Sequence, residues 1–288
     1  MHGPAHNDGF LKNTTFAKRP SHMNPIQDYL QKCQQILRTV AAQEAQIQTA
    51  ARWFADSILA GRMVHVFGSG HSRIMVEEMW PRYGSFPGFN PIVELSLTFH
   101  NLVVGANGQR QAMFLENVPG LAARILRNFD LSRQDSALII SSSGTNVVPV
   151  EMAEIFQQTG IQTVGLLTQQ HSEKSASKRT DGKKLGDFSD LVLDTGAPVG
   201  DAMVYLPGLD TPVAPGSTVG GAALINCLKA EIARLLIEAG RPPKVLVAAA
   251  ITGAQRATEL FEAAYDEHAH RLAKLYAHVG TPSYVSKG

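Results

Sequence analysis

The chain has 288 residues, with 26 Lys and Arg against 25 Asp and Glu, so its formal net charge is +1. The hydrophobic fraction of 44% excludes a disordered chain, and the absence of a basic block argues against nucleic acid as a partner. No run of about 18 apolar residues occurs, which excludes a membrane span and a membrane partner. Charged residues make up 18%, below the usual ~25%, so we expect self-association to cover part of the surface.

The first sixty residues predict an extension followed by a helical arm. Residues 1–23 lack the apolar core of a signal peptide, and we interpret them as a flexible extension of a cytoplasmic protein. From Asn24 to Leu59 apolar residues recur at helical spacing, with Asn24 as the expected N-cap and Pro25 as the first helical residue. A single helix of this length would span about 54 Å. Residues 24–60 therefore predict two helices, or one helix that projects onto a partner subunit.

Beyond Gly61, short apolar runs alternate with helical stretches, which predicts one doubly wound α/β domain over residues 61–280. The predicted strands are Met63–Phe67, Pro91–Leu95, Ala137–Ile140, Thr163–Thr168 and Leu191–Asp194. The predicted helices are Ser72–Trp80, Val118–Phe129, Val147–Gln158, Thr218–Ala239 and Gly253–His278. The runs Ala137–Ile140 and Leu191–Leu193 are apolar throughout, which is typical of strands buried on both faces of a parallel sheet. Between the last two strands, Gln169–Asp187 is predicted to be one long polar loop, a kind of segment that is often functional.

The first of two strand-to-helix turns is Gly68-Ser69-Gly70-His71-Ser72. Glycines let the backbone approach a ligand closely, and a helix N-terminus presents N–H groups and a partial positive charge. No third glycine follows at the spacing of a dinucleotide fingerprint, which argues against a nicotinamide cofactor.

The second turn, Ser141–Asn146, places four hydroxyl groups and a glycine before a predicted helix. It contains no Lys, so it is not the nucleotide P-loop. Neutral donors suit a phosphate monoester that is held rather than transferred. The alternative is that Ser141–Thr145 only cap the helix.

The second turn, Ser-x-Ser-Gly with a nearby Thr before an apolar helix, resembles the SIS (sugar isomerase) domain. Over about residues 24–278 the chain resembles an uncharacterised bacterial SIS family related to phosphoheptose isomerases. The segments that carry the resemblance are Phe67–Ser72, Asn90–Ile92, Ser141–Glu151, Ser177–Arg179, Gly200–Ala202 and Pro215–Thr218. It implies a flavodoxin-like three-layer αβα fold with a five-stranded parallel sheet. It also implies a phosphorylated sugar as the ligand, and a dimer or tetramer in which each site borrows residues from a neighbour.

The resemblance and the two turns together give a set of expected substrate-binding residues. They are Gly68, Ser69, Gly70, Ser72, Ser141, Ser142, Ser143, Gly144, Thr145, Asn146, Arg179, Asp201, Ser217 and Thr218. Four of them have a plainer interpretation: Arg179 as a solvated loop residue, Asp201 as a turn former, and Ser217 and Thr218 as helix caps. Some phosphoheptose isomerases use zinc, but no such ligand spacing is evident, and we expect neither metal nor cofactor.

Interconversion of an aldose and a ketose phosphate moves a proton between adjacent carbons through an enediol, which requires a positioned base. His71 follows the first turn, and Glu77 and Glu78 lie in the next helix, so these three residues are the catalytic candidates. Either carboxylate could instead be a solvated or ion-paired surface residue.

Three functions remain open. The first is a phosphosugar isomerase. The second is a phosphosugar lyase or etherase, which begins with the same proton abstraction. The third is a phosphosugar-sensing protein without catalysis, which the lack of a preceding helix-turn-helix segment makes less favoured.

Overall fold

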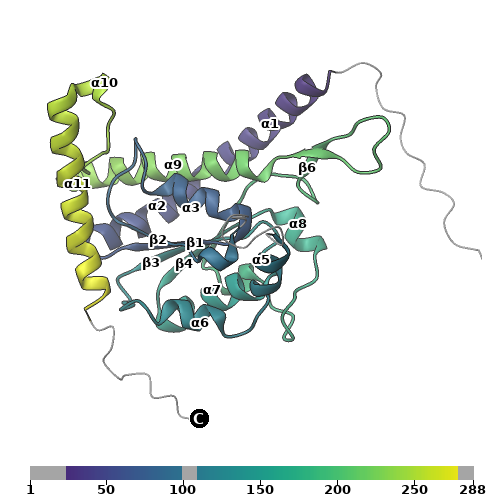
Figure 1. The fold of residues 1–288 in the computed structure, drawn as a ribbon, viewed down its shortest axis with the longest axis horizontal. Helices are drawn as coiled ribbons and strands as arrows, with labels where there is room; N and C mark the ends of the chain where they lie inside the picture. Colours follow the sequence, from purple (N-terminus) through teal and green to yellow (C-terminus); the bar gives the residue numbers. More distant parts are fainter. Residues whose placement is uncertain (1–23, 99–108, 278–288) are drawn as a thin grey trace, which may run out of the picture.

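Five parallel strands in the order β2-β1-β3-β4-β5 form a sheet between two layers of helices in the computed structural model, which describes residues 24–98 and 109–277 (Figure 1). The strands are β1 (Val64–Gly68), β2 (Phe89–Ile92), β3 (Ser136–Ile140), β4 (Gln162–Leu167) and β5 (Leu191–Asp194). This order and the two helical layers confirm the flavodoxin-like three-layer fold. Every predicted strand is present, with ends that differ by at most a few residues.

The central strands are apolar because successive side chains enter opposite helical layers. In β1, Val64 and Val66 join the core that faces α2, α3 and α9, whereas Phe67 joins the core of α6 and α7. In β3, Leu138 and Ile139 alternate in the same way. All residues of both strands are buried.

Helices of very different length cover the two faces. Their bounds are α1 (Pro25–Ala41), α2 (Glu44–Leu59), α3 (Arg73–Met79), α5 (Gln109–Leu115), α6 (Leu121–Leu126), α7 (Val147–Thr159), α8 (Gln169–Lys174), α9 (Ser217–Glu238), α10 (Ala249–Thr252) and α11 (Ala254–Leu275). The predicted stretch from Asn24 to Leu59 thus forms two helices. Asn24 caps the first, since its Oδ1 accepts the N–H of Ile26 at 2.9 Å.

The sequence prediction did not include α5, α8, α10, or an antiparallel ribbon of β6 (Ala202–Val204) and β7 (Val213–Pro215). The predicted polar loop begins with α8 because tertiary contacts hold it. The Lys184 ammonium, for example, donates to the carbonyl of Ser172 at 2.6 Å. The predicted extension at residues 1–23 and the predicted helix end at His278 lie outside the described residues.

The strand order fixes where a ligand can sit. The chain passes from β1 to β2 on one side and then crosses to β3 on the other, so the strand order reverses between β1 and β3. Ligands of open α/β sheets bind at the carboxyl ends of the strands at such a reversal. Both predicted anion-binding turns follow these two strands. Within the described ranges no helix is long and apolar enough to cross a membrane.

Candidate functional site

A cleft of about 460 Å³ opens at the carboxyl ends of β1 and β3, within the range of small-molecule sites. The register of the sheet aligns Gly68 with Ile140, so the two turns begin side by side. Residues from both turns, α5, α8 and the start of α9 line it. They are Ser69, Gly70, His71, Ser72, Met75, Gln109, Ala112, Met113, Glu116, Ile140, Ser141, Ser142, Ser143, Asn146, Leu166, His171, Thr195, Asp201, Pro215, Ser217 and Thr218.

The turn after β3 is a compact group of hydroxyls at the N-terminus of α7. The hydroxyl oxygens of Ser143 and Thr145 lie 2.9 Å apart, and that of Ser141 accepts the N–H of Gly144 at 3.2 Å. Gly144 has φ +63° and its backbone is packed near Leu167, so a side chain there would be strained. Ser142 and Ser143 of this turn therefore line the cleft, whereas Gly144 and Thr145 lie behind them and stabilise the conformation of the turn.

Glu116, just after α5, is the carboxylate of the cleft that the sequence analysis missed. Its Oε2 accepts the Ser69 hydroxyl at 2.8 Å and its Oε1 accepts the Asn146 side-chain amide at 2.7 Å. Its carbonyl also accepts the N–H of Val148 at the start of α7, at 2.9 Å. Burial raises the pKa of the Glu116 carboxyl, although the Ser69 hydrogen bond and the charge of Lys178 oppose the rise. A raised pKa makes this carboxylate a stronger base than an ordinary Glu.

Asp201 organises the far end of the cleft. It has φ +68°, rare for a residue with a side chain, and its carboxylate accepts the N–H groups of Gly216 and Ser217 at 3.0 and 2.6 Å and the Ser217 hydroxyl at 2.7 Å. The N-terminus of α9 is thus already neutralised by a carboxylate from its own chain. An anionic group is therefore better placed at the start of α7.

Two histidines line the cleft, one from the first turn and one from α8. His71 lies in the short 3-10 turn η1 (Gly70–Ser72) and is exposed at the rim. His171 comes from α8, and its Nδ1 accepts the N–H of Gly200 at 3.0 Å. The sequence placed His171 only within a polar loop, and nothing in its spacing marks it as part of a cleft.

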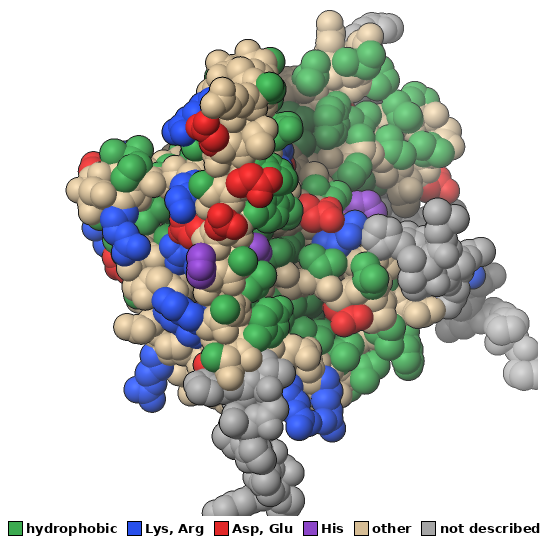
Figure 2. Space-filling view, turned by 60° about the vertical axis from the view of Figure 1, so that its left-hand side comes forward, with side chains coloured by type: hydrophobic (Ala, Val, Ile, Leu, Met, Phe, Trp, Pro, Cys, Tyr) green, Lys and Arg blue, Asp and Glu red, His purple; other side chains and the backbone are tan. Residues whose placement is uncertain are grey.

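Glu77 and Glu78 lie outside this cleft, on a groove between α3 and α11. Glu77 is half-exposed and pairs with Arg73 at 3.3 Å, while Glu78 accepts the Asn226 amide at 2.8 Å and pairs with Arg82. Burial of Glu78 opposes its ionisation, but the hydrogen bonds from Asn226 and Arg82 outweigh it and lower its pKa. Figure 2 shows this side of the molecule, where hydrophobic and charged side chains are mixed along the groove.

Two other predicted binding residues stand behind the cleft. Arg179 pairs with Glu154 at 2.8 Å and with Asp181 at 2.6 Å, so its charge is taken up by its own chain. Gly68 supports the first turn, because a Cβ at this position would lie 2.7 Å from the carbonyl oxygen of Ser72.

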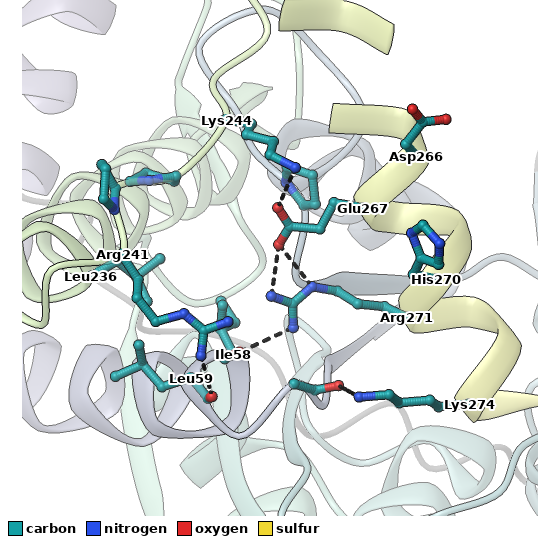
Figure 3. A pocket seen from close by; sticks show the side chains of 14 residues that line it. Ile58, Leu59, Leu236, Arg241, Lys244, Asp266, Glu267, His270, Arg271 and Lys274 are labelled. Carbon is teal, nitrogen blue, oxygen red and sulfur yellow. Dashed lines mark hydrogen bonds and ion pairs between the residues drawn. The ribbon is translucent and has the colours of Figure 1, made fainter. Parts of the chain in front are cut away.

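A second cavity, of about 500 Å³, lies at the opposite edge of the sheet beside the end of α2 (Figure 3). Arg241 donates to the carbonyl of Leu59 at 2.9 Å, and Arg271 donates to that of Ile58 at 3.0 Å. Cations at a helix C-terminus satisfy carbonyls that have no helical partner. We interpret this cluster as the contact that fixes α11 to α2.

Metal binding has no visible basis in the part of the chain that is described. There, no group of three or more His, Cys, Asp or Glu side chains is arranged to hold a metal ion.

Comparison with known proteins places the chain in a family. The family model of the SIS domain matches residues 28–168. A UPF0309 protein of Geobacillus kaustophilus is 31% identical over 252 residues, which cover 87% of this chain and 94% of the relative. A UPF0309 protein of Halalkalibacterium halodurans is 32% identical over 79% of this chain and 92% of its own length. A solved phosphoheptose isomerase from Francisella tularensis has a TM-score of 0.43 and 12% identity over 72% of this chain and 93% of its own.

Proposed function

This chain belongs to the UPF0309 family of SIS-domain proteins, and from that membership and the geometry of the cleft we propose that it binds a phosphorylated sugar. The observation that carries the proposal is that one cleft holds both the hydroxyl turn at the start of α7 and the carboxylate of Glu116. The turn suits the phosphate, and the carboxylate suits the carbon chain next to it.

The phosphate is assigned to the turn after β3. Ser142 and Ser143 supply hydroxyl donors, and the α7 N-terminus supplies N–H groups and a partial positive charge. Asp201 disfavours the other helix N-terminus of the cleft for an anion, because its carboxylate already lies there. Ser217 and Thr218 then face the other end of the sugar.

The finer proposal is aldose–ketose isomerisation, with Glu116 as the base that moves the proton between adjacent carbons. Its raised pKa and its position in the cleft support this role. The proposal therefore moves the base from Glu77 and Glu78, which line another groove, to Glu116. His71 remains a candidate for opening the sugar ring at the rim of the cleft.

The binding step is tested by thermal denaturation with ribulose 5-phosphate, fructose 6-phosphate, glucosamine 6-phosphate and sedoheptulose 7-phosphate. At least one should raise the melting temperature of the wild type, and Ser143→Ala should abolish the rise. Thr258→Ala, which removes an exposed hydroxyl on α11, should leave it unchanged. No response to any of these compounds would contradict phosphosugar binding.

The chemical step is tested by NMR in deuterated water with the compound that binds. Isomerisation exchanges a carbon-bound hydrogen with solvent and converts ketose to aldose. Exchange followed by loss of a substituent would instead indicate a lyase or etherase. Binding without any exchange would indicate a sensor.

The helical arm is the proposed site of self-association. Ile26, Leu30 and Leu37 are exposed along one side of α1, where a second copy would bury them. Sedimentation velocity should report an oligomer, and Leu30→Glu should shift it towards the monomer. A monomeric wild type would contradict this part of the proposal. Action in the cytoplasm stays a prediction.

A further inference from the structure

The imidazole of His171 is held in one orientation at the cleft. Its Nδ1 accepts the backbone N–H of Gly200 at 3.0 Å, in the segment that leads to Asp201. The α8 helix that carries it is fixed at its first residue, where the N–H of Gln169 donates to Asp194 Oδ1 at 3.0 Å. Hydrogen bonds therefore fix both the His171 ring and the helix that places it at the cleft.

This contact sets the tautomer of the ring. A nitrogen that accepts a hydrogen bond carries no proton, so the neutral imidazole of His171 carries its proton on Nε2. Because His171 lines the cleft and its Nδ1 is used by Gly200, Nε2–H is the polar group left for a ligand.

His171 and Glu116 reach the cleft from elements that follow β4 and β2, the strands on either side of the β1–β3 pair. A ligand seated on the two turns would thus lie between a carboxylate and an imidazole N–H. An enediol reaction needs two such groups, one for the proton on carbon and one for the protons on oxygen.

We propose that His171 carries the oxygen-bound protons in the isomerisation assigned to this cleft, an inference that rests on the proposed function. For a ketose, Glu116 takes a proton from C1, and the C–H electron pair forms the C1=C2 double bond. The C2 carbonyl oxygen takes the proton of His171 Nε2, giving the enediol. Nε2 then takes the proton of the C1 hydroxyl, the C1 carbonyl forms, and Glu116 returns its proton to C2. A neutral histidine serves as electrophile in the same manner in triosephosphate isomerase.

The test uses two substitutions of His171, each of which keeps the hydrogen-bonding role of one ring nitrogen and removes the other. In His171→Gln the side-chain amide reaches the place of Nε2 and can donate a hydrogen bond without transferring a proton. In His171→Asn the amide oxygen reaches the place of Nδ1 and can accept from Gly200. His270→Asn, on α11 beside the second cavity (Figure 3), is the matched control.

With the ketose phosphate that gives the largest thermal shift, kcat should fall about 10²–10⁴-fold in both variants. KM should stay within about threefold of wild type in His171→Gln, since its hydrogen bond is kept. His270→Asn should match the wild type. A kcat for His171→Gln within about threefold of wild type would overturn the proton-transfer role.

A second readout does not depend on turnover. Long-range proton–nitrogen NMR of the unliganded protein should show His171 with its proton on Nε2, and a proton on Nδ1 would overturn the inference. A wild type that binds sugar phosphates without exchanging any hydrogen would overturn the isomerase itself. If the wild type isomerises a sugar phosphate and His171→Gln is equally active, only the role of His171 would be overturned.

Discussion

The two edges of the sheet each hold a carboxylate, that of Asp135 buried and that of Glu116 partly buried, and their surroundings shift the two pKa values in opposite directions. At the amino edge, Asp135 accepts Arg62 through both oxygens at 2.9 Å, with His65 Nε2 at 3.2 Å. Burial opposes the ionisation of Asp135, but His65 and Arg62 outweigh it and lower its pKa. At the carboxyl edge, the Glu116 carboxylate accepts hydrogen bonds from the neutral Ser69 hydroxyl and Asn146 amide, and burial raises its pKa against the opposing charge of Lys178.

The difference between these two environments shows how one fold can use one carboxylate for stability and another for chemistry. A carboxylate paired with a buried cation has little tendency to take up a proton, and it stabilises the fold. A carboxylate that is partly buried among neutral donors beside an open cleft keeps its basicity for a ligand.

The largest effect is expected at the carboxyl edge. Glu116→Gln removes the base and keeps the shape of the side chain, so hydrogen exchange should fall about 10²–10⁴-fold, measured by NMR in deuterated water. Sugar-phosphate binding in the thermal assay should persist. Glu259→Gln, an exposed change on α11, is the control. A comparable loss of hydrogen exchange in Glu78→Gln, with Glu116→Gln active, would identify Glu78 on α3 as the base instead.

At the amino edge, Asp135→Asn leaves the largely buried Arg62 without its anionic partner. Breaking a buried ion pair in this way costs about 3–5 kcal/mol, to be measured by urea unfolding at neutral pH. Asp266→Asn, on the exposed side of α11, should change stability little. A loss below about 1 kcal/mol for Asp135→Asn would mean that Arg62 is not left unpaired and buried when this carboxylate is removed.

The pH dependence of stability should differ in sign at the two edges. Because the folded-state pKa of Asp135 is lowered, its contribution is present above the unfolded value near 4 and is lost as pH falls through the folded pKa. The deficit of Asp135→Asn should therefore shrink in acid. Glu116 has a raised folded-state pKa, so its contribution is present below the unfolded value and is lost as pH rises. Urea unfolding across acid and neutral pH measures how the free energy contributed by each carboxylate changes with pH. The same direction of change for Asp135 and Glu116 would contradict the contrast.

A smaller effect is expected from the close packing behind the cleft. A Cβ at Gly220 in α9 would lie 1.9 Å from the carbonyl oxygen of Thr195, so Gly220→Ala must displace backbone. We expect a loss of about 1–3 kcal/mol in urea unfolding. In Gly186→Ala, the matched control, the added Cβ meets only Val192 at 3.9 Å. Equal stability of both variants would show that α9 can move away from β5 freely.

The smallest effect concerns the basicity of Glu116. The Ser69 hydroxyl lowers the pKa of this carboxyl, so Ser69→Ala should move the acid limb of the exchange rate to higher pH. Ser96→Ala, whose hydroxyl donates to Glu94, should leave the profile in place. An acid limb that does not move would argue that Glu116 is not the titrating base.

Local sequence predicted much of the fold because buried strands and capped helices have local signatures. Each of the five strands follows from a short β-rich run, and the start of α1 follows from Asn24 and Pro25. The elements that were missed lack such signatures. The six residues of α8 are all polar, and β6 and β7 span only three residues each.

The residues of the candidate site likewise fall into those that the sequence predicts and those that it does not. The glycine and hydroxyl turns are contiguous in the chain, and their place at the ends of β1 and β3 follows from strand-to-helix order. Glu116 stands beyond the end of a short helix, and its carboxylate contacts the turns through the hydroxyl of Ser69 and the side-chain amide of Asn146. Such contacts between distant segments leave no periodicity in the sequence.

Hydrophobic period, glycine content and hydroxyl content are local properties, so the sequence alone predicts an α/β sheet with two anion-suited turns at one edge. Which charged groups face the cleft depends instead on contacts between distant segments. Glu77 pairs with Arg73 of its own helix and Glu78 pairs with Arg82, while Glu116 and His171 reach the cleft from segments far apart in the chain. The physical reason is that a side chain's role depends on its burial and its partners, and both are set by the packing of the whole chain.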